Sequence, residues 1–374
     1  MGPPSNEGGQ YSRPTVRVLF ASTRGAGHFR PLVPFIDACV RTGHETLIVG
    51  PPGLKAVGYE YRAGASPPDE LVDPIWTRMP TLPPGQGDVV ILGTLFASLT
   101  VDAMLPTFME AVEEWKPDLV LREIYEYASA IAAERHGVRH VRVAAGVALN
   151  EEMALALAGP SLEEREPGIT ERIADSGYLS CFPTVVDPSP FPVSRFRHPA
   201  TEAVPHPLPG WWGDDTRPLV YMSFGTIAAG FPLAEQAYPA ALAAAADLPA
   251  RVLLSTGGNE VELGDLPSNV HVEPWVSEPD VLAVASVAVG HGGAGTTLGA
   301  LAAGCPLVVV PLFGDQPYHA VRVAVSGAGL ASSIDEIGKR VEQVLANETY
   351  RTTAGRMADE MRAFPPVDEF FTSY

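Results

Sequence analysis

His28 is the first residue in the chain whose position suggests chemistry. It follows a turn with two glycines, directly after the apolar run at residues 16–22. A neutral imidazole is the side chain best matched to removing a proton near neutral pH. A lone histidine at a strand end is more often structural, so His28 needs support from the rest of the chain.

The glycine-rich loop at residues 290–295 is a second candidate site. Gly290, Gly292 and Gly295 satisfy the G-x-G-x-x-G pattern, and Asp315 lies twenty residues beyond the last of them. The pattern alone would indicate a nicotinamide dinucleotide site. In such a site the acid follows the second strand of the unit, whereas Asp315 comes after a proline and a short turn. We therefore disfavour a dehydrogenase.

The same loop is well suited to binding an anion. Its glycines leave backbone N–H groups uncovered, and Thr296 opens a helix whose N-terminus carries about half a positive charge. No Lys or Arg occurs between residues 286 and 321. A phosphate group bound here would be held by amides, hydroxyls, the helix dipole and His291.

Other chemistries have little support in the sequence. His136 and His140 are four residues apart, but Gly137 breaks the helical face that a pair of metal ligands would need. No D-x-D pair occurs, so the metal-dependent route to sugar-nucleotide chemistry lacks its usual ligands. The G-x-S-x-G elbow of serine hydrolases is also missing. We expect no metal site.

Composition limits the compartment and the partners. The 374 residues suit two domains, and 46% hydrophobic with 18% charged residues is globular composition. The net charge of -19 repels phosphate backbones and anionic membranes, so we expect neither a nucleic-acid nor a membrane partner. The longest apolar stretch, residues 299–313, is broken by Gly304 and Pro306 and is too short to span a bilayer. Three scattered cysteines fit a reducing compartment, and we expect a cytoplasmic protein.

The elements that must position these residues have the same pattern in both halves of the chain. Continuous apolar runs that end in glycine turns are typical of strands buried on both faces. The predicted strands are residues 16–22, 44–52, 117–124, 138–146, 218–226, 251–258, 269–276, 287–293 and 306–314. Helical patterns lie between several of them, which predicts parallel sheets. The fold class we expect is α/β, with two Rossmann-like doubly wound domains facing a cleft.

The division of the chain follows from proline clusters and composition. We expect a disordered tail at residues 1–15, not a signal peptide, and a first domain over residues 16–207. A linker at 208–217 leads to a second domain at 218–360, and residues 361–374 return to the first domain. Residues 51–110, where prolines cluster, are expected to form loop interrupted by short helices.

The sequence resembles a known family at several of these places. The run HGGAGTTLGALAAGCPLVVVPLFGDQP, preceded by EPWVSEPDVL, is similar to the donor-binding signature of bacterial natural-product glycosyltransferases of the GT-B fold. VRVLFASTRGAGHFRPLVPF and PDLVLREI fit the same family, so the resemblance covers most of the chain. The similarity is greatest to transferases that attach deoxysugars to polyketides and enediynes. It implies an inverting, metal-independent transfer to a hydroxyl of a natural-product aglycone.

The resemblance also implies roles for individual residues. His28 would be the catalytic base and Glu123 the acid that orients it. Trp275, with Val276, would hold the nucleotide base, and Asp315 with Gln316 would contact the sugar hydroxyls. The positions that match the diphosphate-binding residues are His291, Gly293, Gly295 and Thr296, with Ser223, Gly225 and Thr226 on the facing strand.

Two departures from the family pattern bear on the donor. Many relatives have Pro-Gln after the tryptophan-valine pair, where this chain has Ser277 and Glu278. Relatives that use ribonucleotide sugars carry a glutamate for the ribose hydroxyls, where this chain has Gly299. A thymidine nucleotide has no 2′-hydroxyl to satisfy, so the sequence favours a dTDP-sugar as co-substrate, with no other cofactor.

The acceptor is the least determined part of the prediction. Trp76, Phe96, Tyr125 and Tyr127 could line an apolar pocket for a small-molecule aglycone, although each is as readily explained as core. Two other functions fit the same fold, a sugar-nucleotide 2-epimerase and a non-catalytic helper of a glycosyltransferase. A homodimer is compatible with the sequence.

Overall fold

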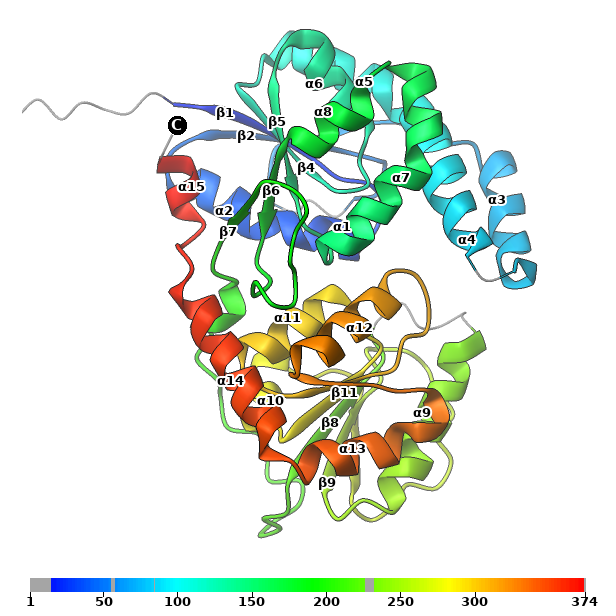
Figure 1. The fold of residues 1–374 in the computed structure, drawn as a ribbon, viewed down its shortest axis with the longest axis vertical. Coiled ribbons are helices and arrows are strands. Elements are labelled where there is room, and N and C mark those ends of the chain that lie inside the picture. The colour runs from blue at the N-terminus through cyan, green and yellow to red at the C-terminus, as the bar shows by residue number, and fades with distance from the viewer. Residues whose placement is uncertain (1–14, 55–57, 84, 226–231, 373–374) are drawn as a thin grey trace, which may run out of the picture.

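The chain folds into two α/β units, each built around a parallel sheet. The computed structural model describes residues 15–54, 58–83, 85–225 and 232–372. Figure 1 shows the first unit above the second, with the C-terminal helices running back up one side. The nine strands predicted from the sequence are all present, and four further short strands extend the two sheets.

The first sheet has seven parallel strands in the order β3-β2-β1-β4-β5-β6-β7. Its strands are β1 Arg17–Ala21, β2 Glu45–Gly50, β3 Tyr61–Ala63, β4 Leu119–Glu123, β5 Arg139–Val143, β6 Gly177–Ser180 and β7 Val193–Arg195. The order reverses direction between β1 and β4, which pair directly. At such a switch point the loops leave the carboxyl ends in opposite directions and open a crevice.

Helices cover both faces of this sheet because its strands are apolar on both faces. In β1, Val18 and Phe20 pack on one side with Phe35 of α2, while Leu19 and Ala21 pack on the other. The helices are α1 Ala26–Phe29, α2 Val33–Arg41, α3 Asp69–Arg78, α4 Gln86–Asp88, α5 Val101–Trp115, α6 Ala128–His136, α7 Ala148–Arg165 and α8 Ile169–Asp175. Short 3₁₀ turns occur at Arg30–Leu32 and Met79–Thr81.

The expectation of a loop-rich segment over residues 51–110 is wrong for its second part. α4, a π-helical stretch at Val89–Thr100 and α5 follow one another without a break from Gln86 to Trp115. By length and composition this helix could cross a membrane, but it packs within the first unit, mainly against α6 and α7. Its stretch Val89–Thr100 is almost wholly apolar and shows no helical period, and Pro106 lies inside α5.

The second sheet has six parallel strands in the order β10-β9-β8-β11-β12-β13. Its strands are β8 Leu219–Ser223, β9 Arg251–Ser255, β10 Val270–Glu273, β11 Val287–Gly290, β12 Leu307–Val309 and β13 Gly329–Ala331. This is the doubly wound order again, with its switch point between β8 and β11. Each sheet therefore has one crevice at its carboxyl edge.

Helices also cover both faces of the second sheet. They are α9 Pro232–Ala246, α10 Glu278–Val284, α11 Ala294–Ala302, α12 Gln316–Ser326, α13 Ile337–Leu345 and α14 Glu348–Ala363. α9 and α13 pack on one face, and α10, α11, α12 and α14 on the other. The second core continues into the first unit through Val147, Phe182 and Val186, which pack with residues of α12.

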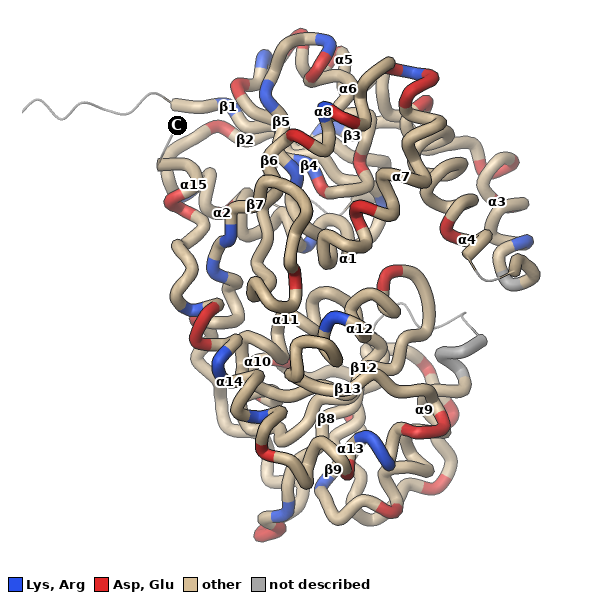
Figure 2. The backbone as a smooth tube through the Cα atoms, in the orientation of Figure 1, with Lys and Arg blue, Asp and Glu red and all other residues tan. Residues whose placement is uncertain are grey.

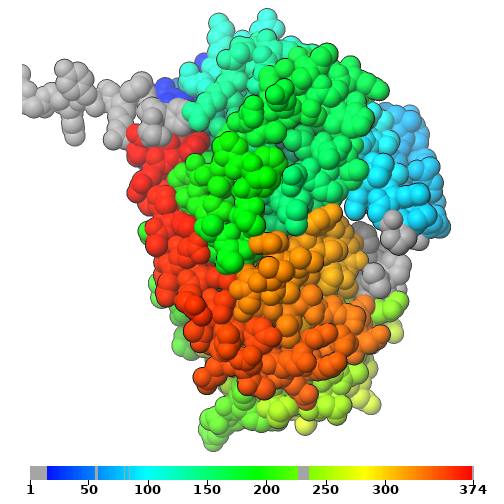
Figure 3. Space-filling view, in the orientation of Figure 1, coloured from blue at the N-terminus to red at the C-terminus, as the bar shows by residue number. Residues whose placement is uncertain are grey.

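The chain crosses between the units twice. After a 3₁₀ turn at Pro199–Glu202, it reaches Trp211 and Trp212, and the Trp211 ring stacks on His271 at a centroid distance of 4.5 Å. At the other end, α15 Asp368–Thr372 packs against α2 and buries Phe371 in the first core. Figure 3 shows this terminal segment lying along both units.

Charged residues are scattered over the surfaces of both units (Figure 2). Many form exposed ion pairs, such as Arg62 with Glu114 at 2.9 Å. Exposed pairs of this kind contribute at most about 1 kcal/mol each. The stability of the protein therefore comes mainly from its apolar layers. The loops at the carboxyl ends of the strands can then carry polar groups.

Candidate active site

His28 and Glu123 meet at the switch point of the first sheet. β1 leads through Gly25, at a φ of 118°, into the short helix that carries His28, and β4 ends at Glu123. Glu123 is fully buried. Its Oε1 accepts hydrogen bonds from the Thr23 amide at 3.2 Å and the Thr23 hydroxyl at 2.6 Å, and Oε2 accepts from the Tyr125 amide at 2.8 Å. These donors compensate the cost of burying the carboxylate.

The fourth contact of this carboxylate is with the imidazole. His28 Nδ1 lies 3.4 Å from Glu123 Oε2, and the His28 side chain is 25% exposed. Because a carboxylate only accepts, this contact keeps the proton on Nδ1 and leaves Nε2 as the basic nitrogen. Burial lowers the pKa of His28, but the charge and hydrogen bond of Glu123, with a smaller effect of Asp315, raise it above the ordinary 6.5.

The pKa of Glu123 is shifted in the complementary direction. Burial raises it, but His28, the Thr23 hydroxyl and the Tyr125 amide lower it, and the net pKa lies below the ordinary value. The carboxylate is thus charged wherever the histidine titrates. A charged, fixed partner is what a histidine needs to accept a proton and hold it.

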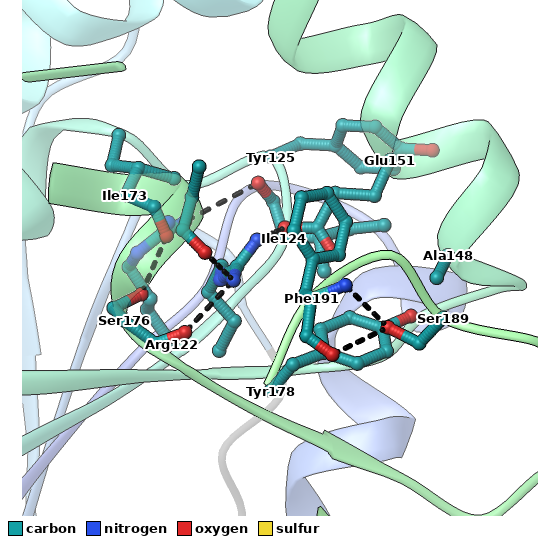
Figure 4. Close-up of polar contacts among 12 residues, drawn as sticks. Arg122, Ile124, Tyr125, Ala148, Glu151, Ile173, Ser176, Tyr178, Ser189 and Phe191 are labelled. Atoms are coloured by element: carbon teal, nitrogen blue, oxygen red, sulfur yellow. Dashed lines mark hydrogen bonds and ion pairs between the residues drawn. The ribbon is translucent and has the colours of Figure 1, made fainter. Parts of the chain in front are cut away.

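Arg122, next to Glu123 in β4, holds the turn that follows. Its side chain is fully buried, and Nη1 donates to the carbonyls of Glu123, Ile124 and Glu126 at 3.1–3.2 Å. Figure 4 shows Arg122 and Ile124 within this group of polar contacts. Arg142 on the neighbouring strand pairs with Glu151 of α7 at 2.7 Å. These buried groups fix the loop that carries Glu123 and Tyr125, so they are part of the support of the site.

Two aromatic rings border the histidine. Phe96 and Tyr125 stack with a centroid distance of 5.6 Å and an interplanar angle of 15°. Both meet the His28 ring edge-on, at 5.7 Å and 5.4 Å. The Tyr125 hydroxyl accepts a hydrogen bond from the Asn150 amide of α7. Two of the four residues expected at the acceptor pocket therefore lie beside the candidate base.

The other two lie elsewhere. Tyr127 is 2% exposed and belongs to the core formed with α5 and α6, so the expectation that it lines a pocket is wrong. Its ring packs under the Arg122 guanidinium at 5.9 Å, on the far side of the turn from Tyr125. Trp76 is half exposed on α3. It contributes an apolar surface at the edge of the first unit.

In the second unit, the glycine-rich loop leads from β11 into α11. Gly293 is the N-cap of this nine-residue helix, and no side chain among the described residues caps its amides. His291 stands between Gly225 and Gly293, where a Cβ on either glycine would lie 2.7 Å or 2.5 Å from the ring. Both glycines are needed because the imidazole occupies that space. Among the residues that the structure describes, no atom lies within 4 Å of a Cβ placed on Gly295.

His291 itself is neutral and incompletely bonded. Burial lowers its pKa to about 4. Its Nδ1 is buried and has no hydrogen-bond partner among the described residues. A neutral imidazole beside open helix amides can donate one hydrogen bond to an anionic oxygen.

Trp275 and Val276 follow β10 on the same edge. The Trp275 side chain is 59% exposed, whereas Val276 packs partly into the core beneath. Glu278 begins α10, and its Oε1 accepts a hydrogen bond from the Thr296 hydroxyl at 2.8 Å. The Thr296 proton is therefore used within the protein. This contact ties the helix after Trp275 to the first turn of α11.

Ser223 and Gly225 lie at the carboxyl end of the facing strand. Ser223 ends β8, is 6% exposed, and pairs in register with Gly290. Gly225 has a φ of 83°, a left-handed conformation that favours glycine. Thr226 lies outside the described residues.

Asp315 and Gln316 lie between the two units. Gln316 is 2% exposed, and its Oε1 accepts hydrogen bonds from the amides of Leu312 and Phe313 at 2.7 Å and 2.9 Å. That oxygen therefore shapes the turn. Asp315 faces the first unit, where a Cβ on Gly146 would lie 3.1 Å from its Oδ2.

Sequence reasoning missed one residue in this region, His319. It is fully buried one turn after Asp315 on α12 and contacts both units. Its spacing of four residues from Asp315 places it on the same helical face, and that spacing is the signal that could have found it.

Replacing Glu123 with Gln should lower the pKa of His28. Gln keeps the size of the side chain but removes the charge, while the burial that lowers the pKa of the imidazole remains. An NMR titration of the His28 ring protons measures this directly. Glu114→Gln, at an exposed carboxylate paired with Arg62, is the control and should leave the titration unchanged. An unchanged His28 pKa in Glu123→Gln would contradict the pairing.

Replacing Gly293 with Ala should destabilise the protein by about 1–3 kcal/mol, the usual cost of overpacking. The φ at Gly293 is −60°, which alanine adopts freely, so the loss would come from the contact with His291. Urea denaturation measures it. Gly355→Ala in α14 is the control, since its Cβ would meet nothing within 4 Å, and helix propensity favours alanine there by up to about 1 kcal/mol. Equal stability of the two variants would show that His291 is free to move.

Comparison with known proteins identifies the family. Residues 88–194 match the N-terminal domain of the erythromycin biosynthesis protein CIII-like family, and residues 240–373 match its C-terminal domain. The chain is 30% identical to the elloramycin glycosyltransferase ElmGT of Streptomyces olivaceus, over 94% of this chain and 95% of that protein.

Solved structures have the same fold. The glycosyltransferase SnogD from Streptomyces nogalater superposes with a TM-score of 0.72 at 25% identity, over 96% of this chain and 99% of that one. The glycosyltransferase VinC, solved in complex with dTDP, superposes with a TM-score of 0.72 at 22% identity, over 96% and 98%. The resemblance and the fold class expected from the sequence are confirmed. The chain belongs to the erythromycin biosynthesis protein CIII-like family of antibiotic-biosynthesis glycosyltransferases, and its two α/β units form the GT-B fold.

Proposed function

We propose that the protein is an inverting, metal-independent glycosyltransferase. It would move a sugar, in particular a deoxysugar, from a dTDP-sugar to a hydroxyl of a natural-product aglycone such as a polyketide or an enediyne. The observation that carries this proposal is the His28–Glu123 pair at the switch point of the first sheet, together with α11, which follows the switch-point strand β11 of the second sheet and has no side-chain cap among the described residues.

The reaction follows from the groups that face the cleft. His28 Nε2 accepts the proton of the acceptor hydroxyl, and the oxygen attacks the anomeric carbon from the side opposite the diphosphate. The new carbon–oxygen bond forms as the bond to the diphosphate oxygen breaks, so the configuration inverts. The nucleoside diphosphate leaves with the electron pair, and Glu123 stabilises the imidazolium that remains.

The donor would lie along the carboxyl edge of the second sheet. The exposed face of Trp275 suits a nucleotide base, since a base presents a π-face to stack on. The amides at the start of α11 and His291 suit the diphosphate. The ribose then falls between them, close to Glu278 and Gly299. That VinC was solved with dTDP supports this class of donor.

The surroundings of Gly299 favour a deoxyribonucleotide. Gly299 offers no side chain, but Glu278 Oε2 would lie 4.0 Å from a Cβ placed there. The other oxygen of Glu278 already accepts from Thr296. One open carboxylate oxygen suits one hydroxyl, the 3′-hydroxyl of deoxyribose. A 2′-hydroxyl would have no comparable partner at this position.

The acceptor would lie against the stacked rings of Phe96 and Tyr125, beside the base. The partly exposed Phe96, backed by the buried Tyr125 ring, suits a flat or apolar aglycone, and Trp76 would extend this surface. We propose no cofactor beyond the nucleotide-sugar, and no nucleic-acid or membrane partner. A cytoplasmic location is consistent with the packing of the apolar helix at residues 86–115 against α6 and α7.

Product formation from a dTDP-sugar and an aglycone should persist in excess EDTA, and His28→Ala should abolish most of it. Loss of a general base costs about two to four orders of magnitude in turnover. Binding of dTDP by the variant should stay close to wild type, because His28 lies in the other unit. Mass spectrometry of the glycoside measures turnover, and calorimetry measures binding.

Three results would count against this mechanism. Strict dependence on a divalent cation would exclude a metal-independent transfer, and near wild-type turnover of His28→Ala would exclude His28 as the base. Epimerised or free sugar formed without an acceptor would favour the 2-epimerase.

The protein should bind dTDP more tightly than UDP. A buried hydroxyl without a partner costs about 1–3 kcal/mol, roughly five- to more than a hundredfold in affinity. Calorimetric titration of dUDP and UDP isolates this effect, since the two ligands differ only in the 2′-hydroxyl. The gap between dTDP and dUDP then reports the thymine methyl group alone.

A double variant provides the matched test. Glu278→Gln with Gly299→Glu moves the carboxylate from α10 to α11, and it should narrow the gap between dUDP and UDP. The Gln removes the repulsion that two adjacent carboxylates would suffer. Tighter binding of UDP than of dUDP by the wild type would overturn the assignment of the donor.

A further inference from the structure

His319 makes two hydrogen bonds that reach in opposite directions. Its Nδ1 lies 2.6 Å from the carbonyl oxygen of Gly292, in the glycine-rich loop. Its Nε2 lies 3.2 Å from the backbone nitrogen of Val147, at the start of α7 in the first unit. The side chain is fully buried. One imidazole thus joins the donor loop to the acceptor-side unit.

The chemistry of the two partners fixes the state of the ring. The Gly292 carbonyl can only accept, so Nδ1 must carry a hydrogen. The Val147 amide can only donate, so Nε2 must be bare. The neutral imidazole protonated on Nδ1 is the one form that makes both bonds.

Each end of this bridge lies in a tightly packed place. Gly292 has a φ of 88°, and a Cβ there would lie 2.6 Å from Val309 Cγ1, so the loop is held closely against β12. On the other side, a Cβ on Gly146 would lie 3.1 Å from both His319 Nε2 and Asp315 Oδ2. A small displacement at either end would therefore lengthen a hydrogen bond.

Other contacts join the same two units without touching the donor loop. Arg322, on the same helix, donates to the carbonyls of Val186 at 2.8 Å and Val185 at 2.6 Å. Phe182 stacks against the His319 ring at 5.7 Å. These contacts hold α12 to the first unit. The bond to Gly292 extends that hold to the loop before α11.

We propose that His319 is a positioning residue that couples the arrangement of the two units to the shape of the donor loop. With both bonds made, the first turn of α11 is held at one distance from the loop that carries Gly146 and Val147. The effect on turnover rests on the proposed function, because His28 must face the donor sugar for transfer to occur.

Two substitutions separate the two bonds. In His319→Asn, the side-chain amide can take the place of Nδ1 and donate to Gly292, but it is too short to reach Val147. In His319→Gln, the amide oxygen can take the place of Nε2 and accept from Val147, while the bond to Gly292 is lost. His136→Asn is the control, because His136 ends α6 and its side-chain hydrogen bond within the described part of the chain is with its own helix, at the carbonyl of Ala132.

Small-angle scattering, calorimetric titration with dTDP and steady-state kinetics should give different results for each variant. His319→Asn should increase the radius of gyration and lower kcat by about tenfold, the effect of one good hydrogen bond, with dTDP affinity and donor KM nearly unchanged. His319→Gln should keep the wild-type radius of gyration and have a kcat between those of His319→Asn and the wild type. It should bind dTDP more weakly than the wild type. The control should match the wild type throughout.

A purely structural role predicts a different pattern. The proposal is overturned if His319→Asn and His319→Gln have the same radius of gyration, the same dTDP affinity and the same kcat. An equal loss of thermal stability in both variants would not change that conclusion. Scattering does not depend on turnover. If the wild type does not transfer sugar from any nucleotide-sugar, the proposed function is wrong. An unchanged radius of gyration in His319→Asn would separately refute the coupling.

Discussion

The carboxylate of Glu123 carries a charge in a place that water does not reach, and three protein donors together with His28 compensate it. An unpaired charge there would cost several kcal/mol. The Thr23 loop, the Tyr125 turn and the imidazole are therefore fixed relative to one another. The orientation of His28 Nε2 and the position of the Tyr125 ring both follow from the hydrogen bonds that the buried Glu123 carboxylate needs.

Parallel sheets provide the frame for this constraint. All carboxyl ends of a parallel sheet lie on one edge, and the strand order of each sheet opens a crevice at its switch point. His28, the proposed catalytic base, lies at the switch point of the first sheet. Helix α11, the proposed anion-binding helix, begins at the switch point of the second. Because α12 packs against the first unit through Arg322 and His319, the two edges face each other. The site is a property of both units together.

The sequence carried enough information for nine of the strands and the two doubly wound sheets, because apolar runs that end in glycine turns have one plain structural meaning. The family resemblance, and not the strand pattern alone, pointed to the His28–Glu123 pair. The helix at residues 86–115 was missed because Val89–Thr100 is almost wholly apolar and shows no helical period, and because Pro106 interrupts the pattern in α5. Tyr127 was expected at the acceptor pocket but lies in the core, because the bend after β4 directs the Tyr125 and Tyr127 rings into different clusters. The nearness of Glu278 to Gly299 depends on how α10 packs on α11, a tertiary contact with no local signal.

The central claim is that the two crevices bind one nucleotide-sugar between them with its sugar beside His28. A crystal structure of the protein with dTDP tests it most directly. The account predicts the thymine ring on Trp275, the diphosphate on the amides at the start of α11, and the terminal phosphate directed across the cleft towards His28. A nucleotide bound at the carboxyl edge of the first sheet, or with its phosphates turned away from α11, would contradict it.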